Sequence, residues 1–355
     1  MLRSEVPSDT VFLRDMAWYD EHDVDLRLGV RATHLDTSAT RITLAGGETI
    51  SYDACLLVTG GRVRTLDCAG CDLEGVVYLR TLHDATALAE KLQQRPRVVV
   101  VGAGFIGAEV AASARMVGCE VTMLEIFEVP LARVLGEDLG RVYAQIHRDH
   151  DVDLQLGETV ERMEGSDRVE AVVGSSGTRY AADLVVIGVG IVPNVELGAE
   201  AGLDCDNGIV VDEHCRTSAP GVYAAGDVAN RPDAFSGGRI RVEHFQNAQN
   251  QGAAAARNML GRDEPFEEVP WFWSDQYDVN LQMLGHPDAE RVVRGSIEAR
   301  EFTALYLRGD RLVAAVAMNR SRDISVTRRL IERRIAVDPA RLGDSDVALK
   351  DLLKG

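Results

Sequence analysis

A glycine-rich segment, residues 102–107, constrains the fold of this chain more than any other feature. Its pattern, G-x-G-x-x-G, follows the β-branched run 97–101, which predicts a buried parallel strand. The small residues that come next predict a helix over 106–117, ended by Gly118, and 120–125 predicts a second strand. Together these pieces predict a right-handed βαβ unit whose glycine loop has the fingerprint of a dinucleotide-binding site.

Each glycine of this loop has its own expected task. Gly102 allows the tight turn, Gly104 lets the backbone approach a pyrophosphate, and Gly107 lets the helix pack closely on the strand. The amide groups and the positive dipole end of the helix would face the phosphates. The loop residues expected to contact the nucleotide are Gly102, Gly104, Phe105, Ile106 and Gly107.

An acidic residue at the end of the second strand, Glu125, is expected to bind the ribose of the nucleotide. No Arg or Lys occurs at 126–128, and Glu128 adds a second negative charge. A 2′-phosphate would be repelled at this position, so the pattern favours NAD over NADP.

Hydrophobic periodicity predicts further elements on both sides of this unit. Expected strands are 41–44 and 48–52 around a Gly46-Gly47 turn, 54–58 running into a glycine turn, a meander over 159–173, 184–190, 222–225, 279–284, 291–297, 302–308 and 311–318. Expected helices are 84–92 with Asp84 as N-cap, 138–150, 248–260, 322–335 and 345–353. Residues 62–80 are expected to be a linker, and 261–265 a boundary before a separate α+β domain.

The net charge of the 355-residue chain is −18, from 38 basic and 56 acidic residues. Such a field repels phosphates, so neither nucleic acid nor a membrane is an expected partner. The longest apolar runs, such as 98–101 and 184–187, are far too short to span a membrane, and 1–5 lack the pattern of a signal peptide. Six cysteines are too few for a disulfide scaffold, so a reducing cytoplasm is expected, and no spacing predicts a metal site.

Several short motifs, among them the glycine loop, follow one another in a definite order along the chain. They are Thr59-Gly60, 102–107 with Glu109, 188–190 with Pro193-Asn194, and 217–227, in which a strand ends at Gly226-Asp227. In this order they resemble the FAD/NAD-dependent pyridine nucleotide-disulfide oxidoreductases, a family with two dinucleotide folds. The segments 243–248, 270–276, Asn319-Arg320 and 328–331 are similar to its ferredoxin reductase branch, which includes putidaredoxin and rubredoxin reductases.

This resemblance covers nearly the whole chain and implies an α/β fold. Two Rossmann-like domains that bind FAD and NAD(P) would be followed by a C-terminal α+β interface domain. The implied boundaries are 1–62 with 197–264 for FAD, 63–196 for NAD, and 265–355 for the interface domain. The implied enzyme is an oxidoreductase that passes a hydride from NADH to FAD, then single electrons to a ferredoxin-type iron–sulfur protein serving a cytochrome P450 or an oxygenase.

The resemblance also implies roles for individual residues. Glu109 would lie near the nicotinamide carboxamide, Phe105 beside the nicotinamide, and Trp273 near the flavin and the partner surface. The helix after His244 would direct its N-terminus at the flavin pyrimidine. Residues implied in cofactor binding are Thr59, Gly60, Arg62, Gly190, Gly226, Asp227, His244, Phe245 and Trp273. Core packing is the alternative role for Trp273, and a buried polar contact is the alternative for His244.

One feature departs from the family pattern. The family begins with a further βαβ unit and G-x-G-x-x-G for FAD, whereas this sequence contains one such fingerprint, at 102–107. The lysine expected beside the flavin is also missing. We therefore expect the first FAD-binding segment to be truncated, which makes flavin binding the property to measure first.

Two other motifs leave alternatives open. Cys68 and Cys71 form a C-x-x-C pair, which would suit a disulfide reductase like thioredoxin reductase, and a non-catalytic NAD-binding protein is a further alternative. Residues 300–340 contain nine Arg and five acidic residues. This stretch is either a solvated helix face or a docking surface for an acidic ferredoxin, whose candidate residues are Arg320, Arg322, Arg328 and Arg329.

Overall fold

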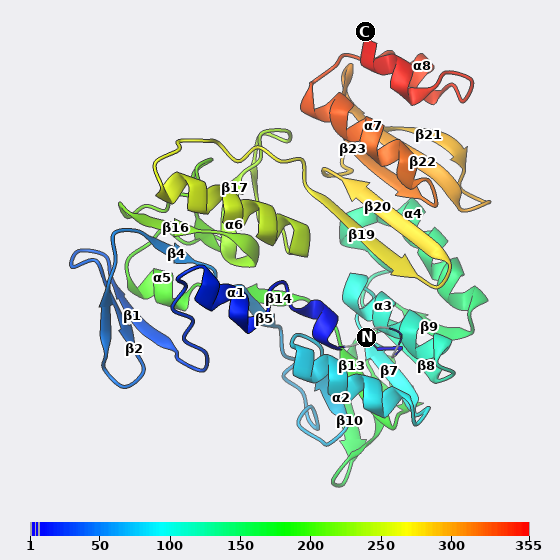
Figure 1. The fold of residues 1–355 in the computed structure, drawn as a ribbon. Coiled ribbons are helices and arrows are strands. Elements are labelled where there is room, and N and C mark those ends of the chain that lie inside the picture. Colours follow the sequence, from blue (N-terminus) through cyan, green and yellow to red (C-terminus); the bar gives the residue numbers. More distant parts are fainter. Residues whose placement is uncertain (1, 4, 6–7, 355) are drawn as a thin grey trace. The chain divides into compact units, whose positions relative to one another are not determined.

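The computed structural model describes residues 2, 3, 5 and 8–354. The chain forms two compact units. Unit 1 comprises 1–8, 63–191 and 273–355, and unit 2 comprises 9–62 and 192–272. Residues 63–191 are thus inserted into unit 2, and the chain returns to unit 1 through β19 (Trp271–Gln276) (Figure 1).

A parallel sheet of five strands, in the order β6-β13-β7-β8-β9, forms the centre of 63–191. The elements that build it are β6 (Val76–Tyr78), α2 (Leu82–Leu92), β7 (Arg97–Val101), α3 (Phe105–Met116), β8 (Glu120–Glu125), α4 (Ala132–Asp149), β9 (Val152–Leu156) and β13 (Leu184–Ile187). Strand β7 lies between β13 and β8, which is why its apolar run is buried on both faces. The βαβ unit predicted around 102–107 is confirmed.

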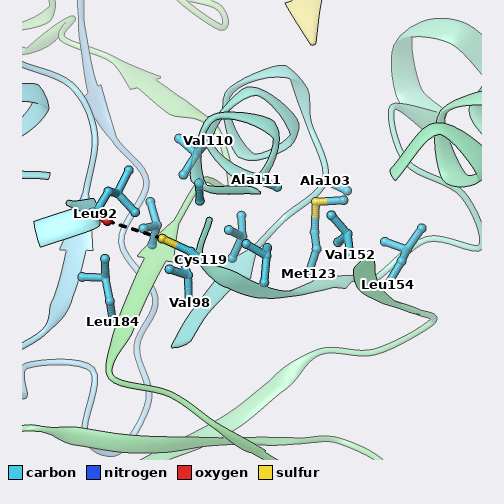
Figure 2. Packing of buried hydrophobic residues seen from close by; sticks show 14 of the residues in the cluster. Leu92, Val98, Ala103, Val110, Ala111, Cys119, Met123, Val152, Leu154 and Leu184 are labelled. Carbon is cyan, nitrogen blue, oxygen red and sulfur yellow. Dashed lines mark hydrogen bonds between the residues drawn. The ribbon is translucent and has the colours of Figure 1, made fainter. Parts of the chain in front are cut away.

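A hydrophobic core lies between this sheet and its helices. Figure 2 shows Val110 and Ala111 of α3 in one cluster with strand residues that include Val98, Met123 and Leu184. The thiol of Cys119 lies in the same core and donates a hydrogen bond to the Leu92 carbonyl at 3.6 Å. The small side chains of α3 let the helix approach the sheet closely, and this approach places the start of α3 beside the glycine loop.

Local details around this sheet differ from the predictions. Helix α2 is capped by Thr81, and Asp84 lies at the third helical position, where the two residues form a reciprocal capping box. The N-cap role predicted for Asp84 is therefore wrong. The predicted linker 62–80 contains β6, a short strand at the sheet edge that pairs with β13.

Two predicted boundaries were also displaced. Helix α4 begins at Ala132 rather than 138, and Gly136 inside it has a φ of +74°, so the helix is kinked there. Strand β13 ends at Ile187, and 188–190 leave the sheet instead of extending the strand. The meander beyond α4 has a third strand, and its members are β10 (Val160–Gly165), β11 (Val169–Gly174) and β12 (Arg179–Ala181).

The C-terminal part of unit 1 is a second five-stranded sheet, in the order β19-β20-β23-β22-β21. Its remaining elements are β20 (Val279–Leu284), β21 (Glu290–Ser296), β22 (Glu301–Arg308), β23 (Arg311–Met318), α7 (Ser321–Glu332), α8 (Pro339–Gly343) and a 3-10 segment, Leu349–Lys354. Helix α7 packs against β23 (Figure 1). The predicted strands are confirmed, but the predicted helix 345–353 is wrong, because 345–348 are not helical and the residues that follow form a 3-10 segment.

Unit 2 is built from short strands around a smaller core. Its elements are a 3-10 segment Ser8–Val11, α1 (Met16–Glu21), β1 (Ala32–Asp36), β2 (Arg41–Leu44), β3 (Thr49–Ser51), β4 (Cys55–Leu57), β5 (Gly61–Val63), β14 (Ile191–Pro193), α5 (Glu196–Glu200), β15 (Ile209–Val210), β16 (Val222–Ala224), a 3-10 segment Gly226–Val228, β17 (Ala229–Pro232), β18 (Arg239–Ile240) and α6 (Phe245–Met259). Strands β4 and β16 pair in parallel. Across the described residues, none of the helices is both long enough and apolar enough to cross a membrane.

Candidate functional site

The glycine loop of unit 1 leaves an open space at the start of α3. Gly102 has a φ of +95°, and a Cβ there would lie 2.6 Å from the carbonyl oxygen of Gly188. A Cβ on Gly107 would overlap the carbonyl oxygen of Gly102, so neither position accepts a side chain. A Cβ on Gly104, in contrast, would meet no protein atom within 4 Å. Gly104 is also the N-cap of α3 and has no side-chain cap, an arrangement that suits a bound phosphate.

Glu125 holds this loop from the end of β8. Its side chain is 6% exposed, and Oε2 accepts a hydrogen bond from the Ala103 amide at 2.6 Å. Oε1 accepts the Phe127 amide at 3.0 Å. Both carboxylate oxygens therefore bind backbone around the loop, while Glu128 is exposed to solvent. A contact between Glu125 and a ribose stays a prediction.

The first turns of α3 carry the other predicted nucleotide residues. Ile106 is 51% exposed and Phe105 is half-buried. Gly190 has a φ of +97°, and its carbonyl accepts the Arg64 amide at 2.9 Å, which fixes the segment after β13. Trp273 is 36% exposed, so it is not a fully buried core residue.

Glu109, one turn further along α3, contacts the C-terminal part of unit 1. Its Oε1 accepts a hydrogen bond of 2.6 Å from the Ser274 hydroxyl on β19. Burial raises the pKa of the Glu109 carboxyl, the Ser274 hydrogen bond opposes this rise, and the nearby charge of Asp275 adds to it. Glu109 also lines a cavity of about 300 Å³. A half-buried residue whose carboxyl group is held by one hydrogen bond and which lines a cavity is suited to accept a hydrogen bond from a ligand.

In unit 2, the predicted site residues in and before β5 all form hydrogen bonds with Asn194. Thr59 Oγ1 donates to the carbonyl of Asn194 at 2.6 Å, and Asn194 Nδ2 donates to the carbonyl of Thr59 at 2.8 Å. The Asn194 amide donates to the carbonyl of Gly60 at 2.9 Å. Arg62 contacts Asn194 Oδ1 and Glu196 Oε1, each at 2.8 Å. The structure therefore brings together Thr59, Gly60 and Arg62.

A second group of predicted residues surrounds the end of β16 and the start of α6. Gly226 has a φ of +76°, and its amide donates to Gln251 of α6 at 3.0 Å. Arg241 donates to the carbonyl of Asp227 at 3.1 Å. His244 is the N-cap of α6, and its Nδ1 accepts the Gln246 amide at 3.2 Å.

Charge and exposure around the start of α6 suit a polar ligand. Burial lowers the pKa of His244, and the nearby charge of Asp227 opposes this effect. Phe245, the first residue of α6, is 53% exposed. A carboxylate, a mainly neutral imidazole and the positive end of a helix thus lie at one place in unit 2, where they can receive hydroxyl groups and a partial negative charge.

Cys68 and Cys71 form a disulfide in unit 1, with their Cα atoms 5.5 Å apart. The Cys71 amide donates to the Cys68 carbonyl, so the bond closes a single turn. Gly70 within it has a φ of +77°, the left-handed value that favours glycine. Both cysteines pack partly against the core of the parallel sheet. The pair is therefore structurally suited to a disulfide.

The four arginines predicted as a docking surface lie in or beside α7. Arg322 and Arg329 are exposed, whereas Arg328 is half-buried. Arg320 forms an ion pair of 2.9 Å with Asp323. The four residues share one helix of unit 1 but differ in how much charge they present to solvent.

Comparison with known proteins identifies the family. Residues 4–252 match the family model described as pyridine nucleotide-disulphide oxidoreductase, and 271–353 match the model described as reductase C-terminal. The chain belongs to the pyridine nucleotide-disulphide oxidoreductase family. The family match spans both the glycine loop of unit 1 and the Asp227–His244 region of unit 2.

Several relatives in this family resemble the chain over almost its whole length. The ferredoxin–NAD(+) reductase component of the anthranilate 1,2-dioxygenase system of Burkholderia cepacia is 44% identical, over 96% of this chain and 85% of its own. A covalent putidaredoxin reductase–putidaredoxin complex matches with a TM-score of 0.95 at 36% identity, over 99% of this chain and 87% of that chain. The ferredoxin reductase for the CYP199A2 system of Rhodopseudomonas palustris matches with a TM-score of 0.93 at 34% identity, over 99% and 87%.

Some residues at these sites were not among the sequence candidates. Ser274 binds Glu109, Gln251 binds Gly226, and Glu196 binds Arg62. Ser274 adjoins Trp273 in the motif at 270–276, so its position beside a predicted site residue is the sequence signal that could have identified it. Gln251 and Glu196 had no signal of their own, because a single Gln in a helix or Glu at a helix start is common on protein surfaces.

Proposed function

We propose that this chain is an NADH-dependent ferredoxin reductase. It takes electrons from NADH, passes them by way of FAD to a ferredoxin-type iron–sulfur protein, and so supplies an oxygenase or a cytochrome P450. The observation that carries this proposal is the likeness, at 34–44% identity and across 96–99% of the chain, to proteins named as reductases of such systems. A cytoplasmic location is part of the proposal and rests on the small number of cysteines.

Each segment predicted from the sequence as a domain is proposed to bind one ligand or partner. Residues 63–196 bind NADH, 1–62 with 197–264 bind FAD, and 265–355 form the surface that meets ferredoxin. For NADH, the cradle at Gly104 fits, because the space that a Cβ would fill there is open. Gly102 and Gly107 shape the turn, Ile106 and Gly190 border the site, and Phe105 and Glu109 meet the nicotinamide end. Both acids, Glu125 and Glu128, disfavour a 2′-phosphate.

For FAD, the group around Asp227 has suitable chemistry. The Asp227 carboxylate can accept ribityl hydroxyl groups, and the α6 N-terminus beyond His244 can stabilise negative charge on the flavin pyrimidine. Thr59, Gly60, Arg62, Gly226 and Phe245 complete the proposed contacts within unit 2. FAD, when bound, converts the two-electron transfer from NADH into single-electron steps.

The proposal is tested first by a visible absorption spectrum of the 355-residue chain purified with FAD. The expected result is a set of bound-flavin bands that bleach on adding NADH, followed by NADH-driven reduction of cytochrome c that requires a ferredoxin. A colourless protein that still binds NADH would favour the non-catalytic alternative. A protein that binds neither cofactor would contradict both assignments.

The proposed docking surface gives a separate prediction. Exchanging Arg322 and Arg329 for Glu reverses two exposed charges, so the KM for an acidic ferredoxin should rise about tenfold at low ionic strength. The KM for NADH should not change. The matched control exchanges Arg168 and Arg179, exposed arginines on or next to the β10-β11-β12 sheet, for Glu. Equal effects of the two pairs would contradict a specific surface on α7.

A disulfide reductase that uses Cys68 and Cys71 is the second candidate, favoured by their bond in the structure. The double variant C68S/C71S separates the two functions. We expect NADH-driven dye reduction and ferredoxin-dependent cytochrome c reduction to stay within about twofold of wild type, because the bond closes one surface turn. Loss of both activities, with the flavin still bound, would instead indicate that electrons pass through the disulfide.

A further inference from the structure

A buried serine joins the two parts of unit 1 at Glu109. Ser274 lies on β19, and its hydroxyl donates to Glu109 Oε1 on α3 at 2.6 Å across a separation of 165 residues. Ser274 is 1% exposed and Gln276 is 0% exposed. The Gln276 side-chain amide donates to Ser274 Oγ at 3.1 Å. Because Oγ accepts from Gln276, the serine hydrogen is directed to the carboxyl group of Glu109.

This arrangement is unlike a packing contact between apolar side chains. Burying a hydroxyl group and an N–H group is costly unless each has an acceptor, and here the Gln276 Nε2–H group and the Ser274 hydroxyl form one directed chain that ends at Glu109. Glu109 is at the same time a lining residue of the cavity of about 300 Å³, which Arg3, Ile106 and Ser113 also line. One carboxylate oxygen is therefore held by the fold, while the residue borders open space.

We propose that Ser274 is a positioning residue for Glu109: it fixes the carboxylate so that its second oxygen can accept the amide N–H of a nicotinamide. The inference rests on the proposed function, because it takes NADH as the ligand. It gives the C-terminal part of the chain a role in nucleotide binding, beyond any role in meeting a ferredoxin. The second oxygen needs no partner from the protein for this purpose, since the ligand supplies the donor.

The charge state of Glu109 makes this role measurable. The groups near it are Ser274 and Asp275 on β19 and Tyr143 on α4, and Arg3 lines the same cavity. A hydrogen bond to the charged carboxylate lowers its pKa, so removing the Ser274 hydroxyl raises the pKa of Glu109. If the carboxylate form binds the amide, the pH below which NADH binding weakens must then move upward.

The test compares S274A with wild type in the full chain, by measuring the Kd for NADH across pH with nucleotide fluorescence. In S274A the midpoint of the acidic limb should move up by about half to one pH unit, since the variant loses one charged hydrogen bond. Near the wild-type midpoint, the KM for NADH should rise several-fold, whereas the rate at saturating NADH and alkaline pH should stay within about twofold. A purely structural tie would change stability without moving the midpoint.

Five further variants, one of them a double variant, complete the experiment. S274T keeps the hydroxyl and should restore the wild-type midpoint, and S274C, a weaker donor, should shift it in the same direction as S274A if the alanine variant does not fold. S296A is the matched control, because Ser296 donates to Glu298 in an exposed turn at 3.0 Å. In E109Q, adding S274A should move nothing further. NADH binding with an unmoved midpoint in S274A and S274C would overturn the inference, whereas failure of wild type to bind NADH would overturn the proposed function itself.

Discussion

Gly104→Ala is expected to leave the chain folded and to remove most of its affinity for NADH. The added methyl group would meet no protein atom within 4 Å, and Gly104 has an ordinary φ of −71°. An N-cap alanine costs the helix about 1 kcal/mol or less relative to glycine. The methyl group would, however, fill the space through which the pyrophosphate approaches the backbone. The Kd for NADH should rise tenfold or more, since about 1.4 kcal/mol of lost binding free energy is a factor of ten.

Alanine substitutions at two other glycines serve as comparisons for this prediction. Gly107→Ala would overlap the Gly102 carbonyl, so it should lower Tm as well as NADH affinity. Gly252→Ala, in the middle of α6, meets no atom within 4 Å and should change neither property for the worse. Thermal unfolding and NADH titration of the three variants separate a steric effect on the ligand from one on the fold. Unchanged NADH affinity in Gly104→Ala would show that the nucleotide does not approach this loop.

Glu125→Ala is expected to destabilise unit 1 strongly. The substitution leaves the amides of Ala103 and Phe127 without the carboxylate that now accepts both hydrogen bonds. A buried donor without an acceptor costs about 1–3 kcal/mol, and the Phe127 amide is only partly buried, so the free energy of unfolding should fall by at least about 1–3 kcal/mol. The loop would lose its anchor to β8, so NADH affinity should fall with stability.

The matched control for this prediction is Glu120→Ala. Glu120 begins the same strand, β8, but its side chain is exposed. Its replacement should change the free energy of unfolding by less than about 0.5 kcal/mol. Urea unfolding of both variants, read by circular dichroism, measures the difference. Equal stability of Glu125→Ala and Glu120→Ala would mean that the loop does not depend on the Glu125 carboxylate.

The parts of the fold that could be predicted are those whose signal is local. The run 97–101 and the glycine pattern at 102–107 dictate a strand, a turn and a helix from adjacent residues alone. The start of α2 was misplaced because Thr81 and Asp84 both have cap-forming side chains, and their reciprocal bonding decides between them. Strand β6 was missed because three residues at a sheet edge owe their conformation to pairing with β13 rather than to their own pattern.

In the candidate site, too, the features with a local sequence signal could be predicted, and those that depend on distant residues could not. The spacing of Gly102, Gly104 and Gly107 is local, so the pattern alone predicts the turn and the start of the helix. The carbonyl of Gly188, which excludes a side chain at Gly102, lies far along the chain and could not be predicted. The partner of Glu109 could not be predicted, because Ser274 lies 165 residues further along the chain and no periodicity links the two. The resemblance to a known family predicts a role for Glu109 near the nicotinamide, and the structure adds which side chain holds its carboxyl group.

The way the chain enters and leaves 63–191 has a consequence for engineering. Strands β5 and β14, at the two ends of this segment, are hydrogen-bonded neighbours, so the segment begins and ends at one place. A continuous stretch with adjoining ends can be exchanged between homologous genes as a single cassette. A chimera would also have to preserve Glu109, Asp138 and Asp149, which bind Ser274, Arg291 and Arg300 of the C-terminal part. Under the proposal that this segment binds NADH, recombination at two crossover points would transfer coenzyme preference, with these three positions retained for compatibility with the C-terminal part.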